Sequence, residues 1–159
     1  MFADEYFVDV GAGSGTGDFA IENPVVAPQK NDGGGQIRVL VLEDDVLQLE
    51  LLVDHLKSVG LATVGVTTVA AARQRLNDAK FNLAIFDVQL PDGSGLELCN
   101  SIADDSRFCN MPTIVLSSVN QANMVRQTRA AGASFFIGKP YDPNVLLTVI
   151  ERALGTDLQ

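Results

Sequence analysis

The chain has 159 residues, of which 47% are hydrophobic, so it is long and apolar enough for one domain with its own core. Its net charge of −9 argues against nucleic acid or an anionic membrane as a direct partner, because both require a basic face. It has no apolar run near the ~18 residues of a membrane span and no positively charged secretory signal. Cys99 and Cys109 lack metal-binding spacing, so we expect free thiols and a cytoplasmic location.

Residues 1–35 differ in composition from the rest of the chain and are predicted to form a flexible, glycine-rich N-terminal extension. Within them, Tyr6–Val10 has the pattern of a strand, and the glycine-rich run Gly11–Gly15 follows it. This arrangement resembles the first motif of S-adenosylmethionine-dependent methyltransferases, in which backbone N–H groups approach a nucleotide. Thr16 stands where a third glycine is needed, and a linker follows instead of further strand–helix units. A nucleotide site is therefore the weaker alternative.

From Ile37 onward, apolar runs of strand length alternate with segments of helical periodicity. Strands are predicted at 37–42, 62–66, 83–86, 113–116 and 134–137. Helices are predicted at 45–59, 69–79, 95–103 and 120–131, and from Asp142 to Leu154. Asp45 and Asp142 are suitable N-caps, and Pro143 suits a first helical position. The alternation indicates an α/β domain at 36–155 with a five-stranded, doubly wound parallel sheet and helices on both faces, followed by a short tail at 156–159.

Polar residues follow four of the five predicted strands. They are Glu43, Asp44 and Asp45 after the first strand, Asp87 after the third, Ser117 and Ser118 after the fourth, and Lys139 after the fifth. The carboxyl ends of parallel strands share one edge, where open α/β sheets carry their chemistry. Crowded carboxylates repel one another unless a cation intervenes, and such oxygen ligands suit Mg²⁺. With Lys139 and a hydroxyl donor, this edge has the parts needed for phosphoryl transfer to a carboxylate.

These residues, in this order, resemble the receiver domain of bacterial two-component response regulators, in particular the single-domain chemotaxis receivers. The resemblance covers residues 37–154 and rests on four segments: Val39–Asp45, Phe86–Gly93, Ser117–Ser118 and Lys139–Pro140. It implies a flavodoxin-like fold with the strand order 2-1-3-4-5. It also implies a cis peptide bond between Lys139 and Pro140.

The resemblance implies a role for each site residue. Asp87 is expected to accept the phosphoryl group, and Lys139 and Ser117 to bind its oxygens. The expected Mg²⁺ ligands are Glu43 through water, Asp44, Asp87 and the backbone carbonyl of Gln89. Ser117 and Phe136 are expected to form a switch that alters the surface of the fourth helix, fifth strand and fifth helix.

The resulting hypothesis is a stand-alone receiver that is phosphorylated on Asp87 by a histidine kinase or a histidine phosphotransfer protein. It is expected to be a phosphoacceptor rather than an enzyme, and a monomer or weak dimer. Because the sequence ends just past the last helix, no output domain is expected. The signal would then pass to a partner protein, or onward by phosphotransfer. The alternative is a receiver-like interaction module that is never phosphorylated, and the intact acids, Ser117 and Lys139 count against it.

Other polar residues receive structural interpretations. His55 lies far from the apolar face of its predicted helix, so we expect a solvent-exposed side chain rather than a phosphorelay histidine. Asp92 follows a proline and is interpreted as a turn residue. Arg126 and Arg129 are expected on a solvent-exposed helix face.

Overall fold

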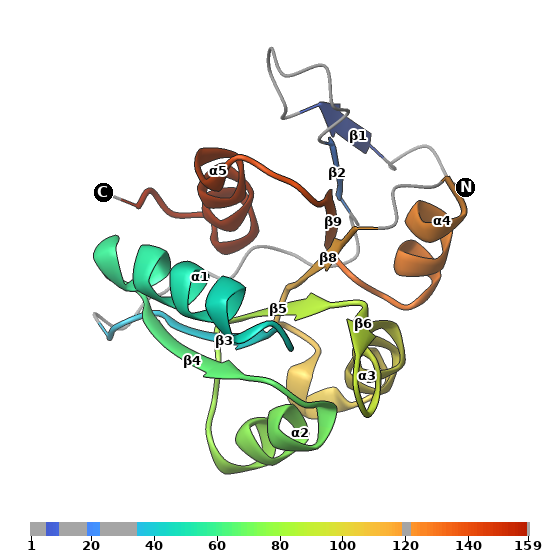
Figure 1. The fold of residues 1–159 in the computed structure, drawn as a ribbon, viewed down its shortest axis with the longest axis horizontal. Coiled ribbons are helices and arrows are strands. Elements are labelled where there is room, and N and C mark those ends of the chain that lie inside the picture. Colours follow the sequence, from blue (N-terminus) through green and yellow to red (C-terminus); the bar gives the residue numbers. More distant parts are fainter. Residues whose placement is uncertain (1–5, 10–18, 23–34, 119–121, 159) are drawn as a thin grey trace.

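The computed structural model describes residues 6–9, 19–22, 35–118 and 122–158 (Figure 1). At the centre of this described part lies a five-stranded parallel sheet. Across the sheet the strands are β4 (Ala62–Val66), β3 (Arg38–Leu42), β5 (Leu83–Asp87), β8 (Thr113–Ser117) and β9 (Phe135–Gly138). Numbered along the chain, these five strands have the order 2-1-3-4-5, which confirms the predicted fold.

In the described residues, four α-helices connect the strands of this sheet and a fifth follows β9, and together they cover both faces of the sheet (Figure 1). They are α1 (Val46–Ser58), α2 (Val69–Asp78), α3 (Gly95–Ala103), α4 (Ala122–Ala130) and α5 (Pro143–Leu154). α1 and α5 pack on one face, and α2, α3 and α4 pack on the other. A short 3₁₀ helix, η1 (Ser106–Phe108), follows α3. None of the described helices combines the length and the apolar character needed to cross a bilayer.

Two hydrophobic layers hold the sheet between its helices. In β3, Leu40 and Leu42 belong to the layer under α2, α3 and α4, whereas Val39 and Val41 belong to the layer under α1 and α5. Each of these four side chains is at most 1% exposed. Successive side chains of a strand point to opposite faces, so a strand covered on both faces must be apolar throughout. This requirement is the reason that unbroken apolar runs identify the strands in the sequence.

Two N-caps predicted from the sequence are confirmed. Asp45 accepts a hydrogen bond from the Gln48 N–H (3.2 Å) at the start of α1. Asp142 accepts one from the Asn144 N–H (2.8 Å), and Pro143 occupies the first turn of α5. The cap on α1 immediately follows the acidic residues at the end of β3, so it fixes how the chain leaves that strand.

A separate hairpin precedes the main domain in the chain. β1 (Tyr6–Asp9) pairs antiparallel with β2 (Phe19–Glu22), and β2 lies alongside β9, the edge strand of the main sheet (Figure 1). The sequence predicts the first of these strands but neither the second strand nor their pairing. An antiparallel hairpin also differs from the strand–helix unit that a methyltransferase-like site requires. The glycine-rich run on which that alternative depends lies outside the described residues.

Candidate functional site

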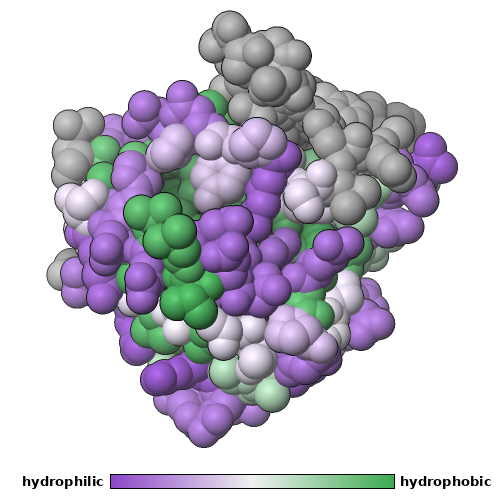
Figure 2. Space-filling view, viewed as in Figure 1, coloured by the Kyte–Doolittle hydropathy of each residue, from purple (hydrophilic) through white to green (hydrophobic). Residues whose placement is uncertain are grey.

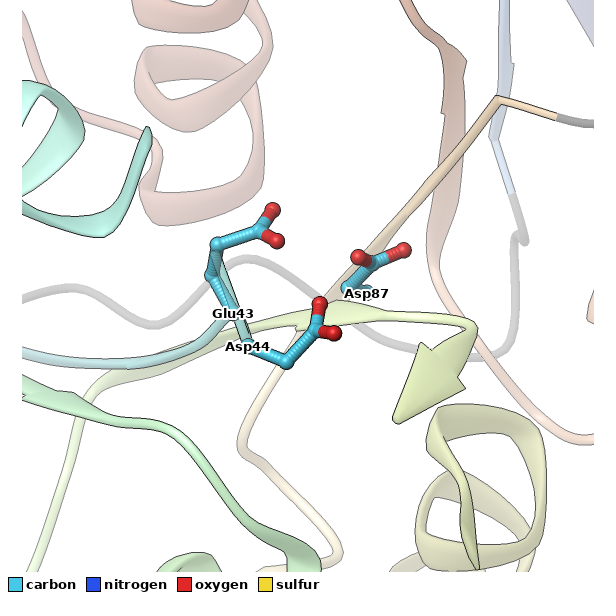
Figure 3. A group of neighbouring side chains, drawn as sticks. All are labelled: Glu43, Asp44 and Asp87. Carbon is cyan, nitrogen blue, oxygen red and sulfur yellow. The ribbon is translucent and has the colours of Figure 1, made fainter. Parts of the chain in front are cut away.

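Three carboxylates meet at the carboxyl edge of the sheet. Glu43 and Asp44 directly follow β3, and Asp87 is the last residue of β5. Leu42 of β3 lies in register with Phe86 of β5, so the residues that follow them emerge side by side. The three acids each offer an oxygen, and these oxygens lie within 4.8 Å of one another at the ends of the two strands (Figure 3).

The three acids differ in their exposure to solvent. Glu43 is 4% exposed and Asp87 is 9% exposed, whereas Asp44 is exposed. The Glu43 N–H donates to the Val66 carbonyl (3.1 Å), and Glu43 Oε1 accepts from the Asp45 N–H (3.2 Å). The cluster therefore has a buried, well-held side and one acid that faces solvent, from which an ion or a reacting group can enter.

Lys139 brings a positive charge to the acids from the end of β9. Its Nζ donates to Glu43 Oε2 (2.5 Å), to Asp87 Oδ2 (3.3 Å) and to Gln48 Oε1 (3.3 Å). Burial lowers the pKa of Lys139, but its hydrogen bonds and charge interactions with Glu43 and Asp87 outweigh this effect and raise that pKa above its usual value. Lys139 is therefore a fixed cation at neutral pH, able to bind a phosphoryl oxygen as well as a carboxylate.

Glu43 carries its charge in an unfavourable environment. Burial raises its pKa above the usual value, and the charge of Asp87 adds to this, while Lys139 and the Asp45 N–H oppose it. Burial and the same two acids raise the pKa of Tyr141 to about 12. Within the described residues, Lys139 pairs with Glu43 and Asp87, and one positive charge against three carboxylates leaves the cluster with an excess of negative charge. A hard divalent cation such as Mg²⁺ fits this set of oxygen ligands.

Ser117 and Gln89 lie at the same edge of the sheet. Ser117 ends β8, is 1% exposed and lies one residue beyond the register partner of Asp87. Its carbonyl accepts a hydrogen bond from the Lys139 N–H (2.7 Å), which joins the ends of β8 and β9. Gln89 is exposed and begins the short strand β6 (Gln89–Leu90), which pairs with β7 (Gly93–Ser94). The residues predicted to form the site therefore converge at one edge.

Phe136, which is expected to act in the switch, is fully buried in β9. It belongs to the layer under α2, α3 and α4 and lies in register with Val115 of β8. β8 and β9 are neighbours, so Ser117 and Phe136 lie on adjacent strands. The peptide bond between Lys139 and Pro140 is cis, as the family resemblance implies.

Two predictions about surface residues are wrong. His55 is half-buried, and its Nε2 atom is buried with no hydrogen-bond partner among the described residues. His55 lines a pocket of about 500 Å³ together with Tyr141 and with Leu146 of α5, so it borders a hollow between α1 and α5. Helical periodicity within α1 does not reveal which element packs beside it. Arg126 is exposed as predicted, but Arg129 is half-buried.

Gly95 and Asp92 also shape the site, although the sequence predicts no role for them there. A Cβ atom on Gly95 would lie 1.9 Å from the carbonyl oxygen of Asp87, so α3 begins in direct contact with the backbone of β5. Asp92 accepts hydrogen bonds from the N–H groups of Val69 and Ala70, which tie the loop after β5 to α2. Glycine and aspartate are ordinary loop residues, so the sequence offers no signal that separates these two from other turn positions.

A family model of the response regulator receiver domain matches residues 39–151. The transcriptional regulatory protein GltR of Pseudomonas aeruginosa is 37% identical over 117 residues, covering 73% of this chain and 48% of GltR. The polar-differentiation response regulator DivK of Brucella anthropi is 26% identical over 117 residues, covering 74% of this chain and 95% of DivK. The chain thus spans about half the length of GltR and nearly all of DivK.

Solved structures have the same fold. A CheY-like response regulator receiver domain protein from Methanospirillum hungatei has a TM-score of 0.72 and 27% identity, covering 76% of this chain and 95% of that one. The BeF3-activated receiver domain of DrrB, a Thermotoga maritima protein, has a TM-score of 0.69 and 26% identity, covering 76% of this chain and 99% of that one. The acidic cluster, Ser117 and Lys139 all lie within the region that the family model matches, and this chain belongs to the family of response regulator receiver domains.

Proposed function

We propose that this receiver domain accepts a phosphoryl group on Asp87 in a Mg²⁺-dependent reaction. The strongest support is the position of Lys139, whose Nζ contacts both Asp87 and Glu43 within the acidic cluster. The site then combines a carboxylate nucleophile, a fixed cation and oxygen ligands for a metal, which are the parts that phosphoryl transfer requires. Membership of the receiver family supports the same assignment.

In the proposed reaction, an oxygen of Asp87 attacks the phosphorus of a phosphohistidine. The new P–O bond forms as the P–N bond to the donor breaks, so the products are an acyl phosphate on Asp87 and a dephosphorylated donor. Lys139 and Ser117 are proposed to bind the phosphoryl oxygens. The acidic cluster and the backbone carbonyl of Gln89 are proposed to hold Mg²⁺, which supplies further positive charge to those oxygens.

We propose that the signal leaves through the surface formed by α4, β9 and α5. Ser117 and Lys139 are joined at the ends of β8 and β9, and Phe136 is buried in β9, so a displacement at the site acts first on these strands. The domain is then a phosphoacceptor with two conformations, not an enzyme that acts on a separate substrate. A partner protein or a second copy in a weak dimer would bind the altered surface, or the phosphoryl group would pass onward.

A donor protein must bring its phosphohistidine to Asp87, so it has to dock on the elements around the acidic cluster. α1 begins directly after this cluster and carries three exposed apolar residues, Val46 (58%), Leu47 (66%) and Leu51 (63%). Figure 2 shows a hydrophobic patch over α1 on a face that is otherwise largely hydrophilic. Because such patches favour contact with another protein, we propose that a histidine kinase or a histidine phosphotransfer protein docks on this patch.

We propose that the output is also a protein contact and not a contact with nucleic acid, since the net charge of −9 opposes binding to phosphate backbones. The proposed location is the cytoplasm. Cys99 and Cys109 are both free thiols, which is the usual state of cysteine in a reducing compartment.

Mass spectrometry after incubation with Mg²⁺ and acetyl phosphate tests the proposal. We expect one phosphoryl adduct on the wild type, which does not form when EDTA is present during the incubation and is absent from the Asp87→Asn variant. The Asp78→Asn variant, altered at an exposed acid at the end of α2, should keep the adduct. If no adduct forms and beryllofluoride causes no change in the NMR spectrum, the domain is a receiver-like interaction module that is not phosphorylated.

A further inference from the structure

The loop that follows Asp87 is a very small hairpin. Its strands β6 and β7 have two residues each, and Pro91 and Asp92 lie between them. A two-stranded hairpin is at best marginally stable on its own in water. The position of the Gln89 backbone within this hairpin must therefore depend on contacts with the rest of the domain.

The base of the hairpin is anchored to the sheet and to its own exit. The Val88 N–H donates to the Leu116 carbonyl (3.2 Å), and the Gly95 N–H donates to the Val88 carbonyl (2.9 Å). These bonds fix where the chain leaves β5 and where it enters α3. They lie at the base of β6 and β7, so they leave the turn to be held by other contacts.

Asp92 anchors the turn to α2. Its Oδ1 accepts a hydrogen bond from the Val69 N–H (2.8 Å), and its Oδ2 accepts one from the Ala70 N–H (3.1 Å). Val69 and Ala70 are the first two residues of α2, and the N–H of the third, Ala71, bonds to the hydroxyl oxygen of the N-cap Thr68 (3.1 Å). Of the N–H groups that have no partner within the first turn of α2, two therefore donate to Asp92 of the hairpin and one donates to the N-cap residue of the helix.

The carboxylate of Asp92 suits this contact in charge as well as in geometry. The two backbone hydrogen bonds from Val69 and Ala70 lower the pKa of Asp92, so the group is ionised at neutral pH. A negative charge near a helix N-terminus is favourable, because the N–H groups there carry partial positive charge. A Cβ atom on the adjacent Gly93 would lie 3.5 Å from the Val69 side chain, so the hairpin also approaches α2 closely here.

We propose that Asp92 is a positioning residue for the phosphoacceptor site. By binding two N–H groups of α2, it holds the β6–β7 hairpin, and with it the Gln89 carbonyl, in the place required for Mg²⁺ binding. This inference rests on the proposed function. Asp92 touches neither the ion nor the phosphoryl group and acts only through the backbone of the hairpin. Partners that orient metal ligands typically change metal affinity by about 10- to 100-fold, and we expect about tenfold for this exposed residue.

Asp92→Ala and Asp92→Asn test the proposal in the full chain, with Asp78→Ala as a control that removes the same charge from the other end of α2. Hydrogen exchange by NMR reports whether the Val69 and Ala70 N–H groups are released. Titration with Mg²⁺ reports the Kd of the metal without any phosphoryl donor. Acetyl phosphate at limiting and saturating Mg²⁺ then reports the rate of adduct formation.

In Asp92→Ala we expect faster exchange at Val69 and Ala70, an increase of about tenfold in the Kd for Mg²⁺, and a slower reaction that saturating Mg²⁺ restores. Asp92→Asn keeps one oxygen acceptor and should give an intermediate Kd. Asp78→Ala should match the wild type.

Two results overturn the role of Asp92. One is an unchanged Kd in a variant whose two N–H groups exchange freely, and the other is unchanged exchange at both N–H groups. Because Asp92→Asn retains an acceptor, it keeps the test informative if Asp92→Ala folds poorly. Failure of the proposed function is recognised separately, since the wild type would then bind Mg²⁺ and form no adduct.

Discussion

The charge on Glu43 makes the metal-free protein sensitive to pH. Burial raises the pKa of Glu43 above its ordinary value of 4.5, so the folded state binds this proton more readily than the unfolded chain does. In EDTA, the contribution of Glu43 to the free energy of unfolding must therefore fall as the pH rises from 4.5 through the raised pKa. We expect Glu43→Gln to be more stable than the wild type at pH 7, because glutamine resembles the uncharged form that burial favours, and urea unfolding measures the difference.

Glu50→Gln is the control, because Glu50 is an exposed acid on α1 and its loss should leave the unfolding curve nearly unchanged. Adding Mg²⁺ should stabilise the wild type more than Glu43→Gln. A Glu43→Gln variant that is less stable than the wild type in EDTA would mean that the contact with Lys139 outweighs the burial of the Glu43 charge.

The sequence predicts the position of a side chain well when that position depends only on the strand that the residue follows. Asp87 directly follows an apolar run and Lys139 lies two residues after another, so the parallel sheet brings them to one edge wherever the helices lie. The surroundings of His55 and Asp92 depend instead on distant segments: His55 lines a pocket with Leu146 of α5, and α2 supplies the N–H groups that bind Asp92. No local pattern in the chain encodes those contacts.

At the scale of the elements, the start of α3 depends on a residue without a side chain. A Cβ atom on Gly95 would lie 1.9 Å from the Asp87 carbonyl oxygen and 2.9 Å from the Asp87 carbonyl carbon. Both are backbone atoms that cannot rotate away, so Gly95→Ala must push α3 away from β5. We expect a loss of about 1–3 kcal/mol in the free energy of unfolding and slower phosphorylation by acetyl phosphate, because Asp87 itself is displaced.

Gly35→Ala is the matched control, since a Cβ atom on Gly35 would have no atom of the described residues within 4 Å. It should unfold and react like the wild type. If Gly95→Ala reacts at the wild-type rate, the backbone of Asp87 tolerates the displacement and α3 does not position the phosphoacceptor.

The elements of the main domain are largely predictable because each strand is buried on both faces and each helix has one apolar side. The ends of these elements are less predictable: β9 begins and ends one residue later than predicted, at Phe135–Gly138. β2 is missed altogether, because Phe19–Glu22 lies in a glycine- and proline-rich segment where a short apolar run has no neighbouring periodic pattern. Its antiparallel pairing with β1 is a contact that composition does not encode.

At the scale of the whole molecule, the β1–β2 hairpin and the acidic cluster occupy separate regions of the fold. β2 lies alongside β9, whereas Asp87 ends β5, and β8 separates these two strands in the sheet. We therefore expect that deletion of residues 1–35 leaves the reaction of Asp87 with acetyl phosphate unchanged. A large loss of the adduct would instead place the extension in the proposed phosphoacceptor site.

The same deletion should change the edge of the sheet. All four residues of β9 are buried, although an edge strand normally presents unpaired backbone groups. Without β2 beside it, we expect faster hydrogen exchange in β9 and stronger self-association, measured by NMR and by sedimentation, because an uncovered edge strand pairs readily with another chain. Unchanged exchange in β9 would mean that α4 and α5 protect the strand without the hairpin. If exchange in β9 does become faster, the hairpin covers the strand that holds Phe136. Any partner of the α4–β9–α5 surface must then bind beside the hairpin or displace the hairpin.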